Sequence, residues 1–218
     1  MSATLENNLV NTKVDRKQIM AIGNQIRLSD SDPHLQLDMY AYNTCKNDDP
    51  DIIKKCNGVI FKKDNVVAPG LPFIETYLSS DKLPDSFINS KLRSFLCYEG
   101  TLIRIFFFES KWLVTTNKKL NAFRSKWSSK DSYGNIFKNS IEYLYSQLDS
   151  KLHKLLGETS TPYNSFLNTL DKNNIYVIKV QNTFENRIVC HAPEFPTIYH
   201  IGTFKDNIFN LDDDISIQ

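Results

Sequence analysis

The sequence predicts an α+β protein with mostly antiparallel sheets and one long amphipathic helix. Short segments rich in β-branched and aromatic residues fill the first half of the chain, an amphipathic stretch follows, and strand-like segments then return. No regular alternation of strands and helices runs through the chain, so a parallel sheet is not expected.

The composition is that of an ordinary globular protein, with 41% hydrophobic and 23% charged residues among 218. A formal net charge of +1 excludes a strongly basic duplex-DNA binder but allows a local basic groove. The four cysteines are dispersed and predict free thiols rather than a metal site. With neither a signal peptide nor a membrane-spanning segment in the sequence, a soluble intracellular protein with no membrane partner is expected.

The first half of the chain predicts an arm followed by strands. Residues 1–32 are expected to be an N-terminal arm or helix, residues 33–209 a domain, and residues 210–218 an acidic tail. The alternation in His34–Tyr42 predicts a strand, and Gly58–Gly70 predicts two short strands around a polar turn.

The second half predicts a hairpin, two helices and two more strands. Glu109–Lys111 is a plausible turn between two apolar strands. Apolar residues at steps of three and four predict a long helix that begins after Asp131 or Ser132 and ends at Gly157. Thr161 as cap and Pro162 at the first position predict a second helix. The remaining strands are expected at Ile175–Val180 and Arg187–His191.

The segment Phe95–Phe108, FLCYEGTLIRIFFF, contains an unusual interruption. Glu99 and Gly100 break one of the most apolar stretches of the chain, and a buried strand pair needs neither. One interpretation is a β-bulge or an edge turn in an unrelated α+β protein. The other is a site that handles a nucleotide.

Five segments carry a family resemblance by their order and spacing. They are CNGVIF, LPFIETY, CYEGTL, KWLVTTNKK and VIKVQNTFENRIV, at residues 56–61, 71–77, 97–102, 111–119 and 177–189. This series resembles the motifs of the bacteriophage-type RNA ligases, a branch of the covalent nucleotidyltransferases, over residues 35–207. The resemblance implies a ligase-type nucleotidyltransferase core, a large DNA virus or phage as source, and a cytoplasmic or virion-associated location. The frequent Asn, Lys and Ile suggest only an AT-rich genome.

The resemblance also implies a reaction that this sequence is not expected to perform. In the family, a lysine attacks the α-phosphate of ATP with the help of metal ions. Cys97 stands at the position of that lysine, Asn57 at that of a phosphate-binding arginine, and Lys179 at that of a glutamate. The later family motifs, which supply a metal-binding acid and two lysines, are not found before Gln218.

We therefore expect a catalytically inactive RNA-ligase-like protein that acts as a nucleic-acid-binding or protein-binding scaffold. No catalytic residue, metal or cofactor is expected, and RNA, another single-stranded nucleic acid or a protein is the expected partner. The expected remnants of the nucleotide cleft, beside Cys97, are Asn57, Gly58, Glu99, Gly100, Asn186 and Arg187. Lys118, Lys119 and Lys179 are the expected nucleic-acid contacts.

Two alternatives remain open. The first is an active ATP- and Mg-dependent RNA ligase or nucleotidyltransferase that uses an unrecognised lysine, such as Lys91 or Lys111, or a partner chain that completes the cleft. The second is a purely structural or interaction protein, in which the lysine clusters form only a solvated surface.

Overall fold

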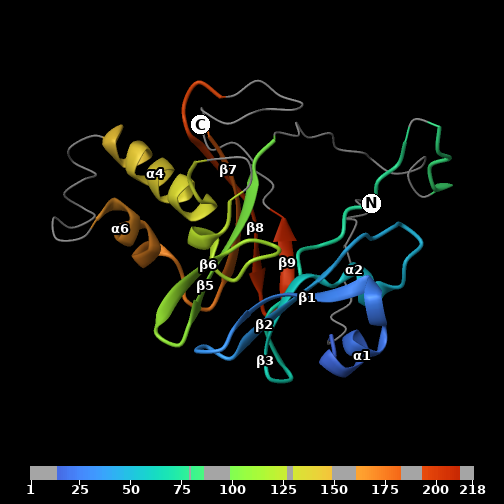
Figure 1. Ribbon diagram of the computed structural model, residues 1–218. Coiled ribbons are helices and arrows are strands. Elements are labelled where there is room, and N and C mark those ends of the chain that lie inside the picture. The colour runs from blue at the N-terminus through green and yellow to red at the C-terminus, as the bar shows by residue number, and fades with distance from the viewer. Residues whose placement is uncertain are drawn as a thin grey trace, which may run out of the picture.

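The computed structural model describes residues 14–78, 80–85, 99–126, 130–148, 161–182 and 193–211. Its strands form two antiparallel sheets (Figure 1), which confirms the expected α+β class. The smaller sheet has the order β1-β2-β3-β4, with bounds Ile26–Asp32, Leu37–Tyr42, Asn57–Lys62 and Asn65–Ala68. The larger sheet has the order β6-β5-β7-β8-β9, with bounds Lys111–Thr115, Thr101–Phe108, Ile175–Gln181, Thr197–Lys205 and Ile208–Leu211.

Helices cover the outer faces of the two sheets (Figure 1). The short helices α1 (Arg16–Ala21) and α2 (Asp51–Lys54) pack on the smaller sheet, and α4 (Tyr133–Ser146) and α6 (Pro162–Thr169) pack on the larger one. Two 3-10 turns, η1 (Gly23–Gln25) and η2 (Ala122–Arg124), complete the described elements. The chain therefore stacks four layers, with the sheets as the two inner ones.

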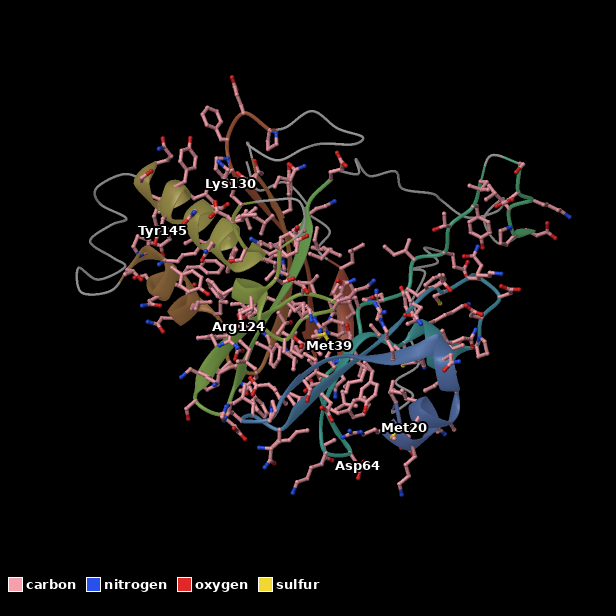
Figure 2. The ribbon with its side chains drawn as sticks, viewed as in Figure 1. Met20, Met39, Asp64, Arg124, Lys130 and Tyr145 are labelled. Carbon is pink, nitrogen blue, oxygen red and sulfur yellow. The ribbon has the colours of Figure 1, made fainter. Side chains whose placement is uncertain are left out.

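The inner faces of the two sheets form a shared apolar core. Met39 and Ile60 of the smaller sheet pack with Phe106 of the larger one, and all three are buried. Figure 2 shows Met39 in the interior, whereas Met20 of α1 lies at the surface, 66% exposed. The alternation of the strands explains this arrangement, because Val59 and Phe61 point to the opposite side from Ile60 and pack with α1 and α2.

Several predicted elements are confirmed. Glu109 and Ser110 have positive φ angles and form the turn between β5 and β6. The Ser132 side chain accepts from the N–H of Asn135 and caps α4, while Thr161 caps α6 with Pro162 in its first turn. The predicted end of this helix at Gly157 is wrong, because α4 ends at Ser146 and the N–H of its C-cap, Gln147, donates to the carbonyls of Leu144 and Tyr145. Residues 149–157 and the predicted strand at 187–191 lie outside the described residues.

The N-terminal and C-terminal expectations need correction. Residues Ile26–Asp32, expected to belong to an arm or helix, form strand β1 instead. This edge strand carries mostly polar residues, and apolar and polar residues do not alternate along it. Strands β8 and β9 were also not predicted, and the expected tail overlaps β9 at Asn210 and Leu211, while residues 212–218 lie outside the described part.

Candidate nucleic-acid interface

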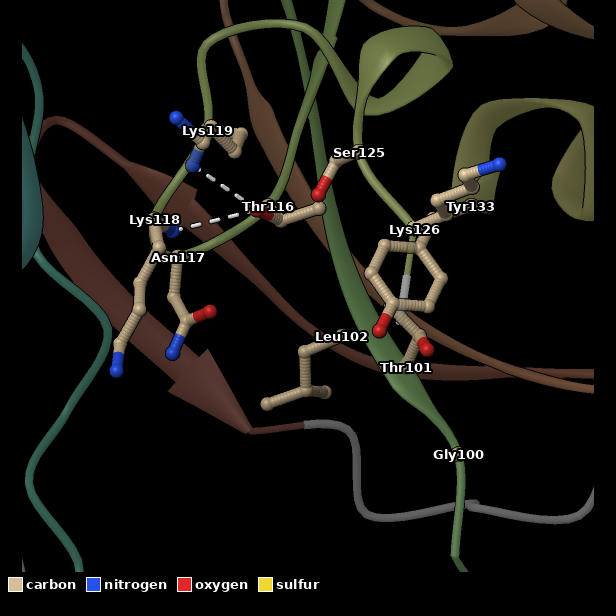
Figure 3. Close-up of a pocket in the computed structure, with 10 residues that line it drawn as sticks. All are labelled: Gly100, Thr101, Leu102, Thr116, Asn117, Lys118, Lys119, Ser125, Lys126 and Tyr133. Atoms are coloured by element: carbon tan, nitrogen blue, oxygen red, sulfur yellow. Dashed lines mark hydrogen bonds between the residues drawn. The ribbon is translucent and has the colours of Figure 1, made fainter. Parts of the chain in front are cut away.

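A tight loop after strand β6 presents two adjacent lysines. The Thr116 hydroxyl oxygen accepts hydrogen bonds from the backbone N–H groups of Lys118, at 3.3 Å, and Lys119, at 3.0 Å (Figure 3). The Thr116 N–H in turn donates to the carbonyl of Lys119 at 2.9 Å. These bonds satisfy the backbone of the turn locally and fix its conformation. We call residues 116–120 the lysine loop.

Strand β1 holds the lysine loop from one side. The Ser29 hydroxyl donates to the carbonyl of Lys118 at 2.8 Å, and the Leu120 N–H donates to a carboxylate oxygen of Asp30 at 2.9 Å. The other Asp30 oxygen lies 3.7 Å from the Lys119 amine. The lysine loop follows strand β6 of the larger sheet, and these contacts from β1 of the smaller sheet fix its position.

Strand β3 packs against the same loop at Gly58. The φ angle of Gly58 is +82°, and a Cβ atom there would lie 2.6 Å from the carbonyl oxygen of Asn117. Only glycine combines this conformation with so close an approach. The neighbouring Asn57 accepts a long hydrogen bond of 3.5 Å from the Asn117 amide.

The lysine loop forms one wall of an open pocket of about 450 Å³. Its lining residues are Gly100, Thr101, Leu102, Thr116, Asn117, Lys118, Lys119, Ser125, Lys126 and Tyr133. Figure 3 shows the Tyr133 ring and the Leu102 side chain opposite the lysine loop. Three lysines and no carboxylate belong to this lining, so every charged side chain that lines the described pocket is positive.

The structure brings several of the predicted site residues together. Gly100, Lys118 and Lys119 line the pocket, and Asn57 and Gly58 support the lysine loop from behind. Of the other predicted residues, Cys97, Asn186 and Arg187 lie outside the described residues.

Glu99, Gly100 and Lys179 meet where strand β5 begins beside β7. The Glu99 carbonyl accepts from the Gln181 amide at 2.6 Å. A Cβ atom on Gly100 would lie 2.7 Å from the carbonyl oxygen of Val180 and 3.0 Å from Cγ of Lys179. Gly100 is thus required for close packing on β7. Lys179 lies directly across from Leu102 but does not line the pocket.

No sequence pattern predicts the placement of two other residues. Tyr133 is the first residue of α4. The Ser132 cap predicts that the helix begins at Tyr133, but it does not predict which part of the sheet the Tyr133 ring faces. Arg104 of β5 was expected only as part of an apolar strand, yet its side chain is fully buried between the sheets. Lys126 also lines the pocket, although it was not among the expected nucleic-acid contacts.

Arg104 connects the two sheets through backbone carbonyls. One terminal nitrogen donates to the Pro69 carbonyl and the other to the Gly58 carbonyl, each at 2.6 Å. Burial lowers the pKa of the guanidinium to about 10, because the charged form loses its hydration. Thr115 of β6 lies directly across from Arg104. The Arg104 Nε and the Thr115 hydroxyl are both buried, and neither has a hydrogen-bond partner among the described residues.

The described residues contain no group of three or more His, Cys, Asp or Glu side chains that could hold a metal ion. Among the helices that the structure describes, none is long and apolar enough to span a membrane.

The fold and this site define an α+β protein of two stacked antiparallel sheets with a lysine-lined pocket. The chain is 30% identical over 147 residues to an immediate-early protein ICP-46 homolog of Invertebrate iridescent virus 6, and 37% identical over 110 residues to one of Invertebrate iridescent virus 3. It is 30% identical over 142 residues to the immediate-early protein ICP-46 of Frog virus 3 (isolate Goorha).

These similarities cover 65%, 45% and 62% of the chain but only 31%, 24% and 33% of the relatives. The chain therefore matches about a third or less of the length of these proteins. No family model matches it. All three relatives are viral proteins, which supports the viral source expected from the sequence.

Proposed function

We propose that this protein is a catalytically inactive relative of the RNA ligases that binds single-stranded nucleic acid, RNA in particular, in the lysine-lined pocket. One observation carries the proposal: Lys118, Lys119 and Lys126 belong to the lining of an open pocket that also includes Leu102 and the half-buried Tyr133. The proposed ligand is a flexible strand whose phosphates and bases are both accessible.

The chemistry of the pocket suits such a strand. Lysine amines bind phosphate oxygens and release condensed counterions, which favours any polyanion. An aromatic ring and an apolar side chain next to these amines offer a surface on which an unpaired base can stack. Bases in a duplex are already stacked on each other, so the ring contributes to binding only when the strand is single.

The proposed relation to RNA ligases is supported by contacts between the motif segments. Residues of the first motif, Asn57 and Gly58, contact Asn117 of the fourth, and Gly100 of the third contacts Lys179 of the fifth. Separate segments of one ancestral site would meet in this way. The proposed loss of activity follows from Cys97 at the nucleophile position and from Lys179 in place of a glutamate, since neither can supply the chemistry of the original residue.

Fluorescence anisotropy with a fluorescein-labelled 20-nucleotide oligouridylate, at 50–300 mM NaCl, tests the proposed binding. Affinity is expected to fall linearly with salt on a logarithmic plot. K118Q and K126Q are each expected to weaken binding about three- to tenfold and to reduce the slope by about 0.7. The matched control is K17Q, because Lys17 is an exposed lysine of α1, which packs on the outer face of the smaller sheet.

The outcomes separate this proposal from the alternative of an interaction protein. Absence of binding at every salt concentration contradicts nucleic-acid recognition and favours a role that uses only the fold. Equal losses in K17Q and K118Q would indicate a non-specific charge effect and would contradict the pocket as the binding site.

A further inference from the structure

Strand β1 contains an irregularity at the point where it touches the lysine loop. The pairing of β1 with β2 shifts between Leu28 and Asp30, so that Ser29 is the extra residue of a β-bulge. Successive side chains of a regular strand point to opposite faces of the sheet. Because of the bulge, both Ser29 and Asp30 reach the same loop.

The Asp30 carboxylate makes two contacts that differ in kind. One oxygen accepts from the Leu120 N–H at 2.9 Å, a backbone contact that a neutral amide oxygen would also make. The other lies 3.7 Å from the Lys119 amine, a contact that depends on the negative charge. The first contact shapes the loop, and the second occupies one of the three amines of the pocket.

We propose that Asp30 is an internal competitor of the nucleic-acid phosphate for Lys119 and thereby sets the affinity of the pocket for polyanions. This inference rests on the proposed function. In the free protein the carboxylate holds the Lys119 amine, and a bound phosphate takes its place. Lys118 and Lys126, which have no carboxylate partner among the described residues, bind phosphate without this competition.

The geometry makes the exchange easy. The side chain of Lys119 is 49% exposed and that of Asp30 is 27% exposed, so water screens their attraction. A distance of 3.7 Å is also longer than a strong charged hydrogen bond. The backbone bonds to Thr116 and Asp30 hold the loop in place while the amine changes partner.

The variant D30N separates the two contacts of Asp30. Its amide oxygen keeps the acceptor for the Leu120 N–H, while the negative charge beside Lys119 is lost. We expect D30N to bind the oligouridylate about three- to fivefold more tightly than wild type at 100 mM NaCl, with a salt slope steeper by about 0.7. This direction is diagnostic, because damage to the loop would weaken binding.

Two controls identify the cause of a gain. D38N removes the same charge from strand β2, where Asp38 pairs with Arg16 away from the pocket, and is expected to change the affinity much less. In the K119Q background, D30N is expected to give at most a small gain, since the amine it would release is absent. Far-ultraviolet circular dichroism checks the folding of each variant. If D30N does not fold, D30S replaces it, because the serine hydroxyl is also an acceptor.

The results distinguish the two levels of the proposal. If neither wild type nor D30N binds the oligouridylate, both the proposed function and the role of Asp30 are wrong. If wild type binds and D30N binds no more tightly, or if D38N gains as much as D30N, only the role of Asp30 is overturned.

Discussion

Arg104 donates a 2.6 Å hydrogen bond to the carbonyl oxygen of Gly58, and so joins strand β5 of the larger sheet to strand β3 of the smaller one. Gly58 in turn contacts Asn117 of the lysine loop. A buried cation, a glycine carbonyl and the lysine loop therefore form one continuous series of contacts. This series connects the packing of the two sheets with the shape of the pocket.

The first prediction concerns the Arg104 side chain. R104M is expected to lower the free energy of unfolding by about 2 kcal/mol, because the carbonyls of Gly58 and Pro69 lose their donor, although the loss of a buried charge offsets part of the cost. R104K is expected to be intermediate, since an ammonium group lacks the planar fork that reaches both carbonyls. Urea unfolding at pH 7 measures both variants, and a stability of R104M equal to wild type would contradict this role.

The second prediction concerns Gly58. G58A is expected to destabilise the protein by about 2–3 kcal/mol, because it combines a strained φ angle with a contact of 2.6 Å to the Asn117 carbonyl. Gly23 provides the matched control, since its φ angle is +77° but nothing lies within 4 Å of its Cβ position. G23A should therefore show only the conformational cost, about 1 kcal/mol. Equal effects of the two substitutions would mean that the approach to Asn117 is not tight.

The third prediction concerns alkaline pH. Burial raises the pKa of Tyr163 to about 12, because the phenolate would lose its hydration. The stabilisation from the neutral phenol is fully present below pH 10 and is lost as the pH rises through 12, since the unfolded chain ionises first. Y163F should remove this contribution. Between pH 9 and pH 12, the free energy of unfolding of Y163F should therefore fall by about 1–2 kcal/mol less than that of wild type.

Urea unfolding of both proteins at several pH values in this range measures that difference. The phenylalanine ring can keep the edge contacts with Phe123 and Phe137, so the pH 7 values serve as the reference. Parallel loss of stability in the two proteins would show that Tyr163 ionises with an ordinary pKa.

The fourth prediction concerns catalysis. Incubation with α-labelled ATP or GTP and a divalent metal, followed by denaturing electrophoresis, is expected to leave the protein unlabelled, because a cysteine stands where the adenylated lysine of an RNA ligase would be. A labelled band that disappears on substitution of one lysine, such as Lys91 or Lys111, would instead establish an active nucleotidyltransferase.

Local signals in the sequence were sufficient to predict much of the fold. The polar break at Glu109 and Ser110 predicts the turn between β5 and β6, and Ser132 and Thr161 predict where two helices begin. Strand β1 was missed because it is an exposed edge strand with a bulge, in which polar residues interrupt any alternation. Its place in the sheet depends on pairing with β2, a contact that no local pattern reveals.

The candidate site was predictable only in part. Adjacent lysines at 118 and 119 and the Glu-Gly pair at 99 and 100 stand out in the sequence as charge and as an interruption. The contributions of Asp30 and Tyr133 depend on tertiary contacts between segments far apart in the chain, about 90 residues in the case of Asp30 and Leu120. Arg104 was missed for a related reason, because its acceptors are backbone carbonyls, which leave no mark in the sequence.

Photo-crosslinking most directly tests the central claim that the lysine-lined pocket binds a single strand. The protein is irradiated with an oligouridylate that contains 4-thiouridine, and the attached peptide is identified by mass spectrometry. The expected cross-link lies in the peptide that contains Tyr133 or Leu102, the residues on which a base would stack, and is lost in the K118Q/K126Q double variant. A cross-link confined to segments outside the pocket, such as helix α1 or strand β9, would contradict the account.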